Sequence, residues 1–120
     1  VPKLTLRVRP LAVKRALANL IGNAADYGSA VQVTVTHIGS EAVVIVEDNG
    51  HGIDPEHYED AFKPFSRLDA SRNQNMSGVG LGLAVARDVA RAHGGDVRLG
   101  KAGLGGLRAE FALPLSSAEE

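Results

Sequence analysis

The sequence predicts a two-layer α/β sandwich, in which a mixed, largely antiparallel sheet carries about three helices on one face. Amphipathic helical segments and alternating strand segments are spread along the chain. They do not alternate strictly, as they would around a doubly wound parallel sheet. The 120 residues are enough for one domain with a single core. We expect that domain at residues 1–115, followed by a disordered tail at 116–120.

The expected strands show alternating apolar and polar side chains, β-branched residues and turns at their ends. They are residues 4–8, 31–36, 41–47, 96–99 and 107–113. The turn at 39–40 joins the second and third strands into a hairpin. We expect 31–36 to be half-buried, and 41–47 to be central because its middle is apolar. The last two strands are joined by the glycine-rich stretch GKAGLGG.

The expected helices are residues 10–26, a short helix that starts at 54–56, and 81–93. Pro10 suits the first turn of the first helix, which ends before Gly28. Pro55 suits the first position of the short helix, with Asp54 as its cap. Residues 66–77 are polar and lack periodicity, which predicts a mobile loop between the short helix and the last one.

Composition excludes several classes of function. The chain is 44% hydrophobic and 22% charged, with a net charge of −1, which speaks against a nucleic-acid partner or an anionic membrane surface. It has no cysteine, so disulfides and thiolate metal sites are excluded. No apolar run approaches the roughly 20 residues of a membrane helix. The first residue is Val rather than Met, so we expect a piece of a longer protein.

Three glycines alternate where the last helix begins, in SGVGLGLAVARDVARAHGG at 77–95. Glycine disfavours a helix start, but it lets the backbone approach a ligand, and a helix N-terminus attracts anions. This pattern indicates a phosphate cradle. It is not the dinucleotide fingerprint, because Leu83 stands at the sixth position, and it lacks the G-K-[ST] of a P-loop. A flexible loop closing onto a buried helix is the alternative.

The first helix has a polar face formed by Arg15, Asn19, Asn23 and Asp26. Asparagine is a poor residue for a helix interior, so two of them one turn apart suggest a role for their amide oxygens. Such an oxygen can complete the coordination of a phosphate-bound Mg²⁺. A tolerated polar face is the alternative.

The stretch DNGHG at 48–52 follows a strand that we expect to be central. A partly buried carboxylate at Asp48 needs hydrogen-bond donors, and the exocyclic amine of adenine is one. A plain strand-to-helix turn is the alternative. The aromatic pair in FKPF at 62–65 suggests the anchor of a lid, although Phe62 also suits the core.

Four of these stretches together resemble a known family. NLIGNAADYG (19–28), DNGHGI (48–53), FKPF (62–65) and GVGLGL (78–83) resemble the N, G1, F and G2 boxes of sensor histidine kinases. The resemblance covers nearly the whole chain and is to their catalytic, ATP-binding domain, most closely to the osmosensor-like class. It implies the Bergerat fold that these kinases share with DNA gyrase.

The resemblance also implies roles for individual residues. Asn23 resembles the Mg²⁺ ligand, Asp48 the acceptor of the adenine amine, and Arg67 an arginine that reaches the phosphates. The further ATP-binding residues that it implies are Tyr27, Gly50, Gly52, Ile53, Phe65, Gly78, Val79, Gly80, Leu81 and Gly82. One departure is Asp26, because many relatives have a cation at that position.

Asn19 bears on the reaction. Relatives that hydrolyse ATP have a glutamate at the matching position, and an amide cannot serve as a base. This favours transfer of the γ-phosphoryl group to a histidine over gyrase-type hydrolysis. None of the four histidines has the sequence context of the family's phosphoacceptor, so the resemblance places the acceptor outside this chain.

The resemblance implies that this chain works with other parts and proteins. The partners are a dimerisation domain of the same full-length protein, which carries the phosphoacceptor, and a downstream response regulator. The fragment alone would be a monomer, and it would be a cytoplasmic domain of a bacterial inner-membrane protein. The alternative is a degenerate nucleotide-sensing module without transfer activity, for which Asp26 is the main argument.

Overall fold

The structure is a computed structural model that describes residues 8–63 and 79–115. The expected loop at 66–77, the expected tail at 116–120 and most of the expected strand at 4–8 lie outside the described residues.

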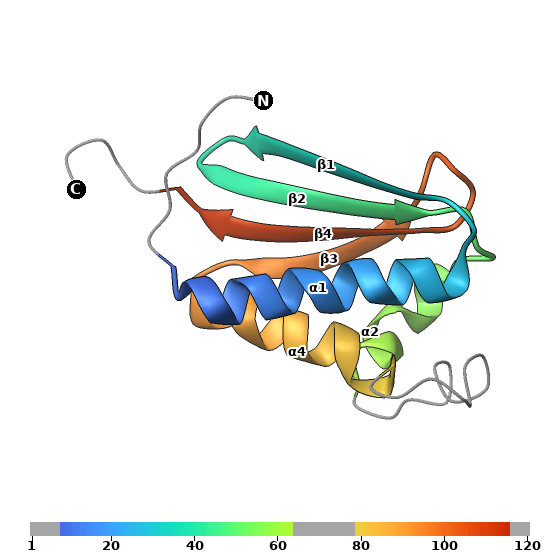
Figure 1. Cartoon of the computed structure of the whole chain (residues 1–120), viewed down its shortest axis with the longest axis horizontal. Helices are drawn as coiled ribbons and strands as arrows, with labels where there is room; N and C mark the ends of the chain where they lie inside the picture. The colour runs from blue at the N-terminus through green and yellow to red at the C-terminus, as the bar shows by residue number, and fades with distance from the viewer. Residues whose placement is uncertain (1–7, 64–78, 116–120) are drawn as a thin grey trace.

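The described chain forms two layers, a sheet and a layer of helices on one of its faces (Figure 1). The sheet has four strands in the order β1-β2-β4-β3, and each neighbouring pair is antiparallel. Their bounds are β1 Val31–Ile38, β2 Glu41–Asp48, β3 Asp96–Lys101 and β4 Leu107–Pro114. The predicted two-layer sandwich is confirmed, with β2 in the interior of the sheet as expected.

The helix layer contains α1, α2 and α4, and the 3-10 turn η1 comes directly before α2. Their bounds are α1 Pro10–Tyr27, η1 Pro55–His57, α2 Tyr58–Ala61 and α4 Val79–Ala92. Pro10 opens α1, and Gly28 caps it by donating its N–H to the carbonyl oxygen of Ala24 at 3.0 Å. Helix α4 begins two residues before the predicted start, so Gly80 and Gly82 lie inside its first turns.

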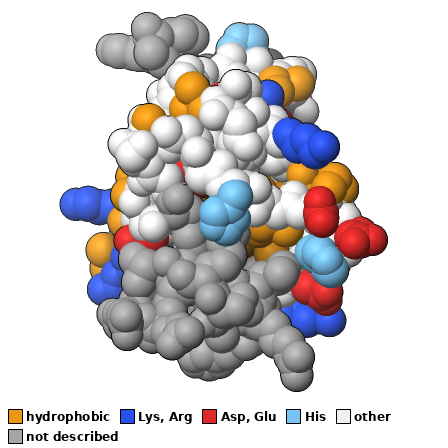
Figure 2. All heavy atoms as spheres, turned by 90° about the vertical axis from the view of Figure 1, so that its right-hand side faces the viewer, with side chains coloured by type: hydrophobic (Ala, Val, Ile, Leu, Met, Phe, Trp, Pro, Cys, Tyr) orange, Lys and Arg blue, Asp and Glu red, His pale blue; other side chains and the backbone are white. Residues whose placement is uncertain are grey.

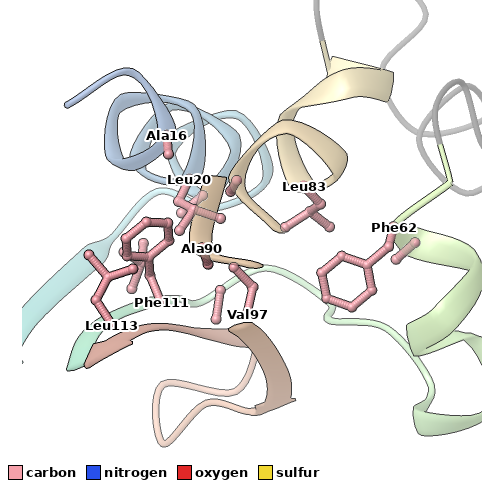
Figure 3. Close-up of a cluster of buried hydrophobic side chains, with 13 residues drawn as sticks. Ala16, Leu20, Phe62, Leu83, Ala90, Val97, Phe111 and Leu113 are labelled. Atoms are coloured by element: carbon pink, nitrogen blue, oxygen red, sulfur yellow. The ribbon is translucent and has the colours of Figure 1, made fainter. Parts of the chain in front are cut away.

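The core lies between the two layers, and alternate residues of each strand face it. In the β2–β4 register Val46 stands opposite Ala109, and both belong to the main buried cluster. Figure 3 shows Leu20 of α1 and Leu83 of α4 meeting the sheet side chains there. Each large apolar side chain buried in this way contributes about 1.5–3 kcal/mol.

Strand β1 departs from the prediction of a half-buried strand. Its valines on the helix side, Val31, Val33 and Val35, are 36–45% exposed. Strand β1 is at the end of the strand order, and the main core cluster includes no residue from it. The alternation of the sequence was therefore a correct sign of a strand, but the helices do not cover this edge.

His93 connects the end of α4 to the start of α1. Its Nδ1 lies 2.8 Å from the carbonyl oxygen of Val89, and its Nε2 accepts a hydrogen bond from the backbone N–H of Arg9 at 3.0 Å. This arrangement suits the tautomer in which Nδ1 donates to Val89 and Nε2 accepts from Arg9. In the part of the chain described here, no helix combines the length and the apolar character that a membrane span requires.

Candidate functional site

A small hollow lies between α1, α4 and the sheet. The space free of protein atoms there amounts to about 210 Å³ when the open solvent at its mouth is counted. Its lining residues come from α1, β2, α4 and β4, and they are Leu20, Asn23, Ala24, Val46, Asp48, Leu83, Leu107 and Ala109. Six of the eight are apolar, and the two polar side chains come from stretches that the sequence indicated as ligand-binding. We call this site the Asp48 hollow.

Asp48 is the last residue of β2, and only 2% of its surface is exposed. Its Oδ1 accepts hydrogen bonds from the backbone N–H groups of Gly50 at 2.9 Å and Leu107 at 3.2 Å. Its own carbonyl oxygen accepts from the N–H of Gly106 at 3.0 Å. Main-chain donors from two loops therefore fix this buried carboxylate in one orientation, ready to accept a further hydrogen bond.

Gly106 makes this arrangement possible, and the sequence analysis did not assign it to the site. A Cβ at this position would lie 2.1 Å from Oδ1 of Asp48 and 2.7 Å from the backbone nitrogen of Gly50. No side chain fits there. The run of glycines just before β4 was the available signal, but it gave no indication of which one approaches Asp48.

Gly52 lies on the other side of the same contact. Its φ is +70°, a conformation that glycine adopts far more readily than other residues. A Cβ on Gly52 would lie 3.4 Å from the carbonyl carbon of Gly106, so the two loops approach backbone to backbone. The predicted role of Gly50 and Gly52 in shaping a pocket remains a prediction, but both are half-buried beside Asp48.

Asn23 is the second polar residue of the hollow. It is 7% exposed, and its Oδ1 is buried without a hydrogen-bond partner among the described residues. Buried polar atoms are almost always paired, and leaving one unpaired costs about 1–3 kcal/mol. An unpaired amide oxygen in the lining of a hollow is available to bind a ligand. An oxygen donor of this type suits Mg²⁺.

Asn49 holds the end of α1 next to Asp48, a role that the sequence analysis also missed. Its Oδ1 accepts from the backbone N–H groups of Ser29 at 2.8 Å and Ala30 at 2.9 Å, and its Nδ2 donates to Ser29 Oγ at 3.1 Å. A Cβ on Gly28 would come within 2.6 Å of the same Oδ1. The pattern DNG predicted a turn, but it did not show what the amide would bind.

The remaining predicted residues divide into three groups. Asn19 is exposed, and Ile53 packs partly buried against the core. Tyr27 ends α1, and residues 79–82 form the start of α4, where the backbone is described and the side chains are not. The predicted residues that lie outside the described ranges are Phe65, Arg67 and Gly78.

The start of α4 bears on the predicted phosphate cradle. The first four N–H groups of a helix have no partner within it. Because α4 begins at Val79, the backbone of Val79, Gly80, Leu81 and Gly82 supplies those groups. Gly80 and Gly82 therefore lie within the first turns of the helix rather than ahead of it. Asp26 is exposed.

Figure 2 looks onto the end of the molecule where α1 and β2 finish, and acidic and histidine side chains gather at its right. Asp54, Glu56 and His57 place one potential ligand atom each within 4.8 Å of one another. Asp54 and Glu56 are exposed. Nδ1 of His57 also lies 3.8 Å from Oδ2 of Asp60. These residues are not part of the Asp48 hollow.

The fold and the site define an open α/β sandwich with a largely apolar hollow, containing two polar side chains, at one end of its sheet. The chain belongs to the family of histidine kinase-, DNA gyrase B- and HSP90-like ATPases, whose sequence pattern matches residues 8–117. This family was the one indicated by the four sequence boxes.

Its relatives include sensor kinases. The chain is 45% identical over 104 residues to the sensor protein RstB of Escherichia coli, and 43% identical over 107 residues to the sensor histidine kinase GtrS of Pseudomonas aeruginosa. These matches cover 86% and 88% of this chain but only 24% and 22% of the relatives. The chain thus spans about a quarter of their length.

Solved structures agree with the fold. The ATP binding domain of PrrB from Mycobacterium tuberculosis superimposes with a TM-score of 0.77 at 29% identity, over 97% of this chain and 76% of that one. The histidine kinase domain of the E. coli osmosensor EnvZ gives 0.65 at 38% identity, over 94% and 70%. Full-length ShkA, solved in complex with AMPPNP, gives 0.77 at 30% identity, over 98% and 24%.

Proposed function

We propose that this chain binds Mg-ATP in the Asp48 hollow and donates the γ-phosphoryl group to a histidine on a separate dimerisation domain. The observation that supports this most directly is the unpaired, buried Oδ1 of Asn23 in the same hollow as the buried carboxylate of Asp48. Family membership and the AMPPNP complex of ShkA point the same way.

In this proposal the two polar side chains recognise opposite parts of the nucleotide. Asp48 accepts the adenine amine, because its backbone donors already hold the carboxylate in place. The apolar lining, with Leu83 from α4 and Ala109 from β4, encloses the base. Tyr27, Gly50, Gly52, Ile53 and Phe65 are proposed to complete its surroundings.

Asn23 is proposed as the metal ligand, because its orphaned oxygen fits the donor type that Mg²⁺ prefers. When bound, the metal neutralises phosphate charge. The backbone N–H groups of the cradle at 78–82 would bind the phosphates at the N-terminus of α4. Arg67 is proposed to contact them too.

The chemistry needs positioning and charge neutralisation more than covalent help from the protein. Asn19 is exposed one turn before Asn23, and its amide is not a base for activating water. We therefore propose transfer rather than hydrolysis. The acceptor histidine, its dimerisation domain and a response regulator lie outside residues 1–120. A longer bacterial, membrane-anchored protein fits the relatives, of which this chain covers about a quarter.

Calorimetry with ADP and a non-hydrolysable ATP analogue, with and without magnesium, tests nucleotide binding. We expect the wild type to bind both, more tightly with magnesium. Asn23→Leu should lose the magnesium-dependent part and gain about 1 kcal/mol or more of stability, because it removes an unpaired buried oxygen. Asp48→Asn should lose selectivity for adenine over guanine nucleotides. Unchanged affinity in both variants would show that this hollow is not the site.

A second experiment tests transfer. The chain is mixed with labelled ATP and a separately produced dimerisation domain from a relative such as RstB. Acid-labile label should appear on the added domain and not on this chain. ATP binding without transfer to the dimerisation domain of either RstB or GtrS would favour the nucleotide-sensing alternative. The variant Asp26→Lys would then test whether the lack of a cation at position 26 prevents transfer.

A further inference from the structure

Arg87 connects three elements of the domain, the helices α4 and α2 and the strand β3. It lies on α4, and its side chain is 15% exposed. Its guanidinium forms a fork on Glu59 of α2, with Nη1–Oε1 at 3.1 Å and Nη2–Oε2 at 3.4 Å. Its Nε donates to Oδ1 of Asp96 at the start of β3, at 3.2 Å. The guanidinium carbon also lies 4.0 Å from the centre of the Phe62 ring.

The charge of Arg87 is stabilised in this position. Burial disfavours the charged form, but the hydrogen bonds to Glu59 and Asp96 outweigh it, so the pKa of Arg87 is raised. Arg91 binds the same carboxylate oxygen of Asp96 at 3.1 Å. A planar fork of this kind fixes the direction of its partner as well as its distance, which a lysine cannot do.

Helix α2 depends on such contacts for its position. It has four residues, far fewer than a helix needs to be stable alone. Ala61 is its one buried residue, and Phe62 follows directly after it. Arg87 of α4 therefore holds α2 at two points, at Glu59 within the helix and at Phe62 directly after it.

Arg87 also stands close to the proposed nucleotide site without being part of it. It lies four residues after Leu83, so the two share one side of α4. Leu83 lines the Asp48 hollow, and it belongs to the same buried cluster as Phe62 (Figure 3). Movement of α2 relative to α4 would therefore shift the residues at the start of α4.

We propose that Arg87 is a positioning residue for nucleotide binding, which acts by clamping α2 to α4 and so sets where the first turns of α4 lie. Those turns hold Leu83 and the backbone of the proposed cradle. This inference rests on the proposed function. It assigns no contact between Arg87 and the nucleotide.

Two substitutions test the clamp. Glu59→Gln removes the charge of an exposed partner and leaves the core intact, while Arg87→Lys keeps the charge but loses the fork. Glu110→Gln is the matched control, because it removes the charge of one acidic residue that pairs with both Arg98 and Arg108 on the other face of the sheet. The affinities for adenosine and for a non-hydrolysable ATP analogue with magnesium are measured for each, together with Tm.

We expect the affinity for the ATP analogue to fall about 2- to 5-fold in Glu59→Gln, the size of an exposed ion pair, and further in Arg87→Lys. Adenosine affinity should fall less, because adenosine has no phosphates. Hydrogen bonds from backbone N–H groups to phosphates depend on direction, whereas contacts of the base with the apolar lining of the hollow do not. Glu110→Gln should leave both affinities unchanged. In an Arg87→Met background, Glu59→Gln should add nothing, since the pair acts as one unit.

The outcomes separate this inference from the proposed function. A wild type that binds neither adenosine nor the ATP analogue overturns the proposed function. A wild type that binds both, with unchanged affinities in Glu59→Gln and Arg87→Lys or with equal losses for both ligands, overturns the clamp alone. If Arg87→Lys fails to fold, Glu59→Gln still decides the question, because Glu59 is 78% exposed.

Discussion

Asp48 and Arg87 both make several polar contacts, but the groups that they contact are of different kinds. Around Asp48 the donors are backbone N–H groups of Gly50, Gly106 and Leu107, and a glycine allows two loops to touch. Around Arg87 the contacts are between charged side chains of separate elements.

This difference determines what each region tolerates. Main-chain contacts cannot be altered by changing a charge, and they are as rigid as the strands and turns that hold them. Side-chain ion pairs near the surface are weakened by salt and by protonation. The Asp48 hollow should therefore be most sensitive to the size of the residues around the carboxylate, and the Arg87 region most sensitive to their charge.

The largest effect should come from adding one methyl group beside Asp48. In Gly106→Ala the new Cβ would lie 2.1 Å from Oδ1, so the β3–β4 loop must move away and its hydrogen bonds are lost. We expect a loss of about 3 kcal/mol in the free energy of unfolding, measured in urea, and no detectable binding of adenine nucleotides.

Gly103→Ala in the same loop is the control for this substitution. A Cβ there meets no atom of the described residues within 4 Å, so stability and binding should stay at the wild-type level. Equal behaviour of the two variants would mean that the close approach of Gly106 to Asp48 does not hold in solution.

A smaller effect should follow from removing the amide of Asn49, which joins the α1–β1 connection to the loop after Asp48. In Asn49→Ala the N–H groups of Ser29 and Ala30 lose their acceptor. Both lie in exposed surroundings where water can replace it, so we expect a loss of about 1 kcal/mol. Asn49→Asp keeps an oxygen acceptor and should lose less. Thermal unfolding of the three proteins at one pH checks the order.

The sequence predicted the elements well where local chemistry decides them. Helix α1 was expected at 10–26 and is found at Pro10–Tyr27, because a proline and a glycine mark its two ends. Strand β2 was expected at 41–47 and ends one residue later, at Asp48. The exposure of β1 was not predictable in the same way, because it depends on which strands the helices cover.

The site shows the same division. The sequence indicated Asn23 and Asp48, because an asparagine within a helix and an acid before two glycines are locally unusual. It could not indicate Gly106, which lies 58 positions from Asp48, or the pairing of Arg87 with Glu59, because those contacts exist only once the elements have packed. Arg87 looked like any surface cation of an amphipathic helix.

The smallest effect should be a pH dependence confined to the charged region. At Asp96 burial disfavours the carboxylate, but the hydrogen bonds from Arg91, Val97 and Arg87 outweigh it and lower its pKa below the usual 3.8. The carboxyl group of Asp96 therefore binds a proton less tightly in the folded state than in the unfolded state. The contribution to stability is therefore complete above about pH 4 and is lost as the pH falls through the lowered pKa.

Asp96→Asn isolates this contribution, since an amide cannot titrate but can still accept a hydrogen bond. At pH 7 the variant should be less stable by under about 1 kcal/mol, because Asp96 is 36% exposed and water screens its pairs. Between about pH 4 and 2 the wild type should lose more stability than the variant, so the two unfolding curves should converge. Parallel curves over that range would mean that Arg87 and Arg91 do not depend on the charge of Asp96, and the contrast with the Asp48 hollow would then rest on the fork to Glu59 alone.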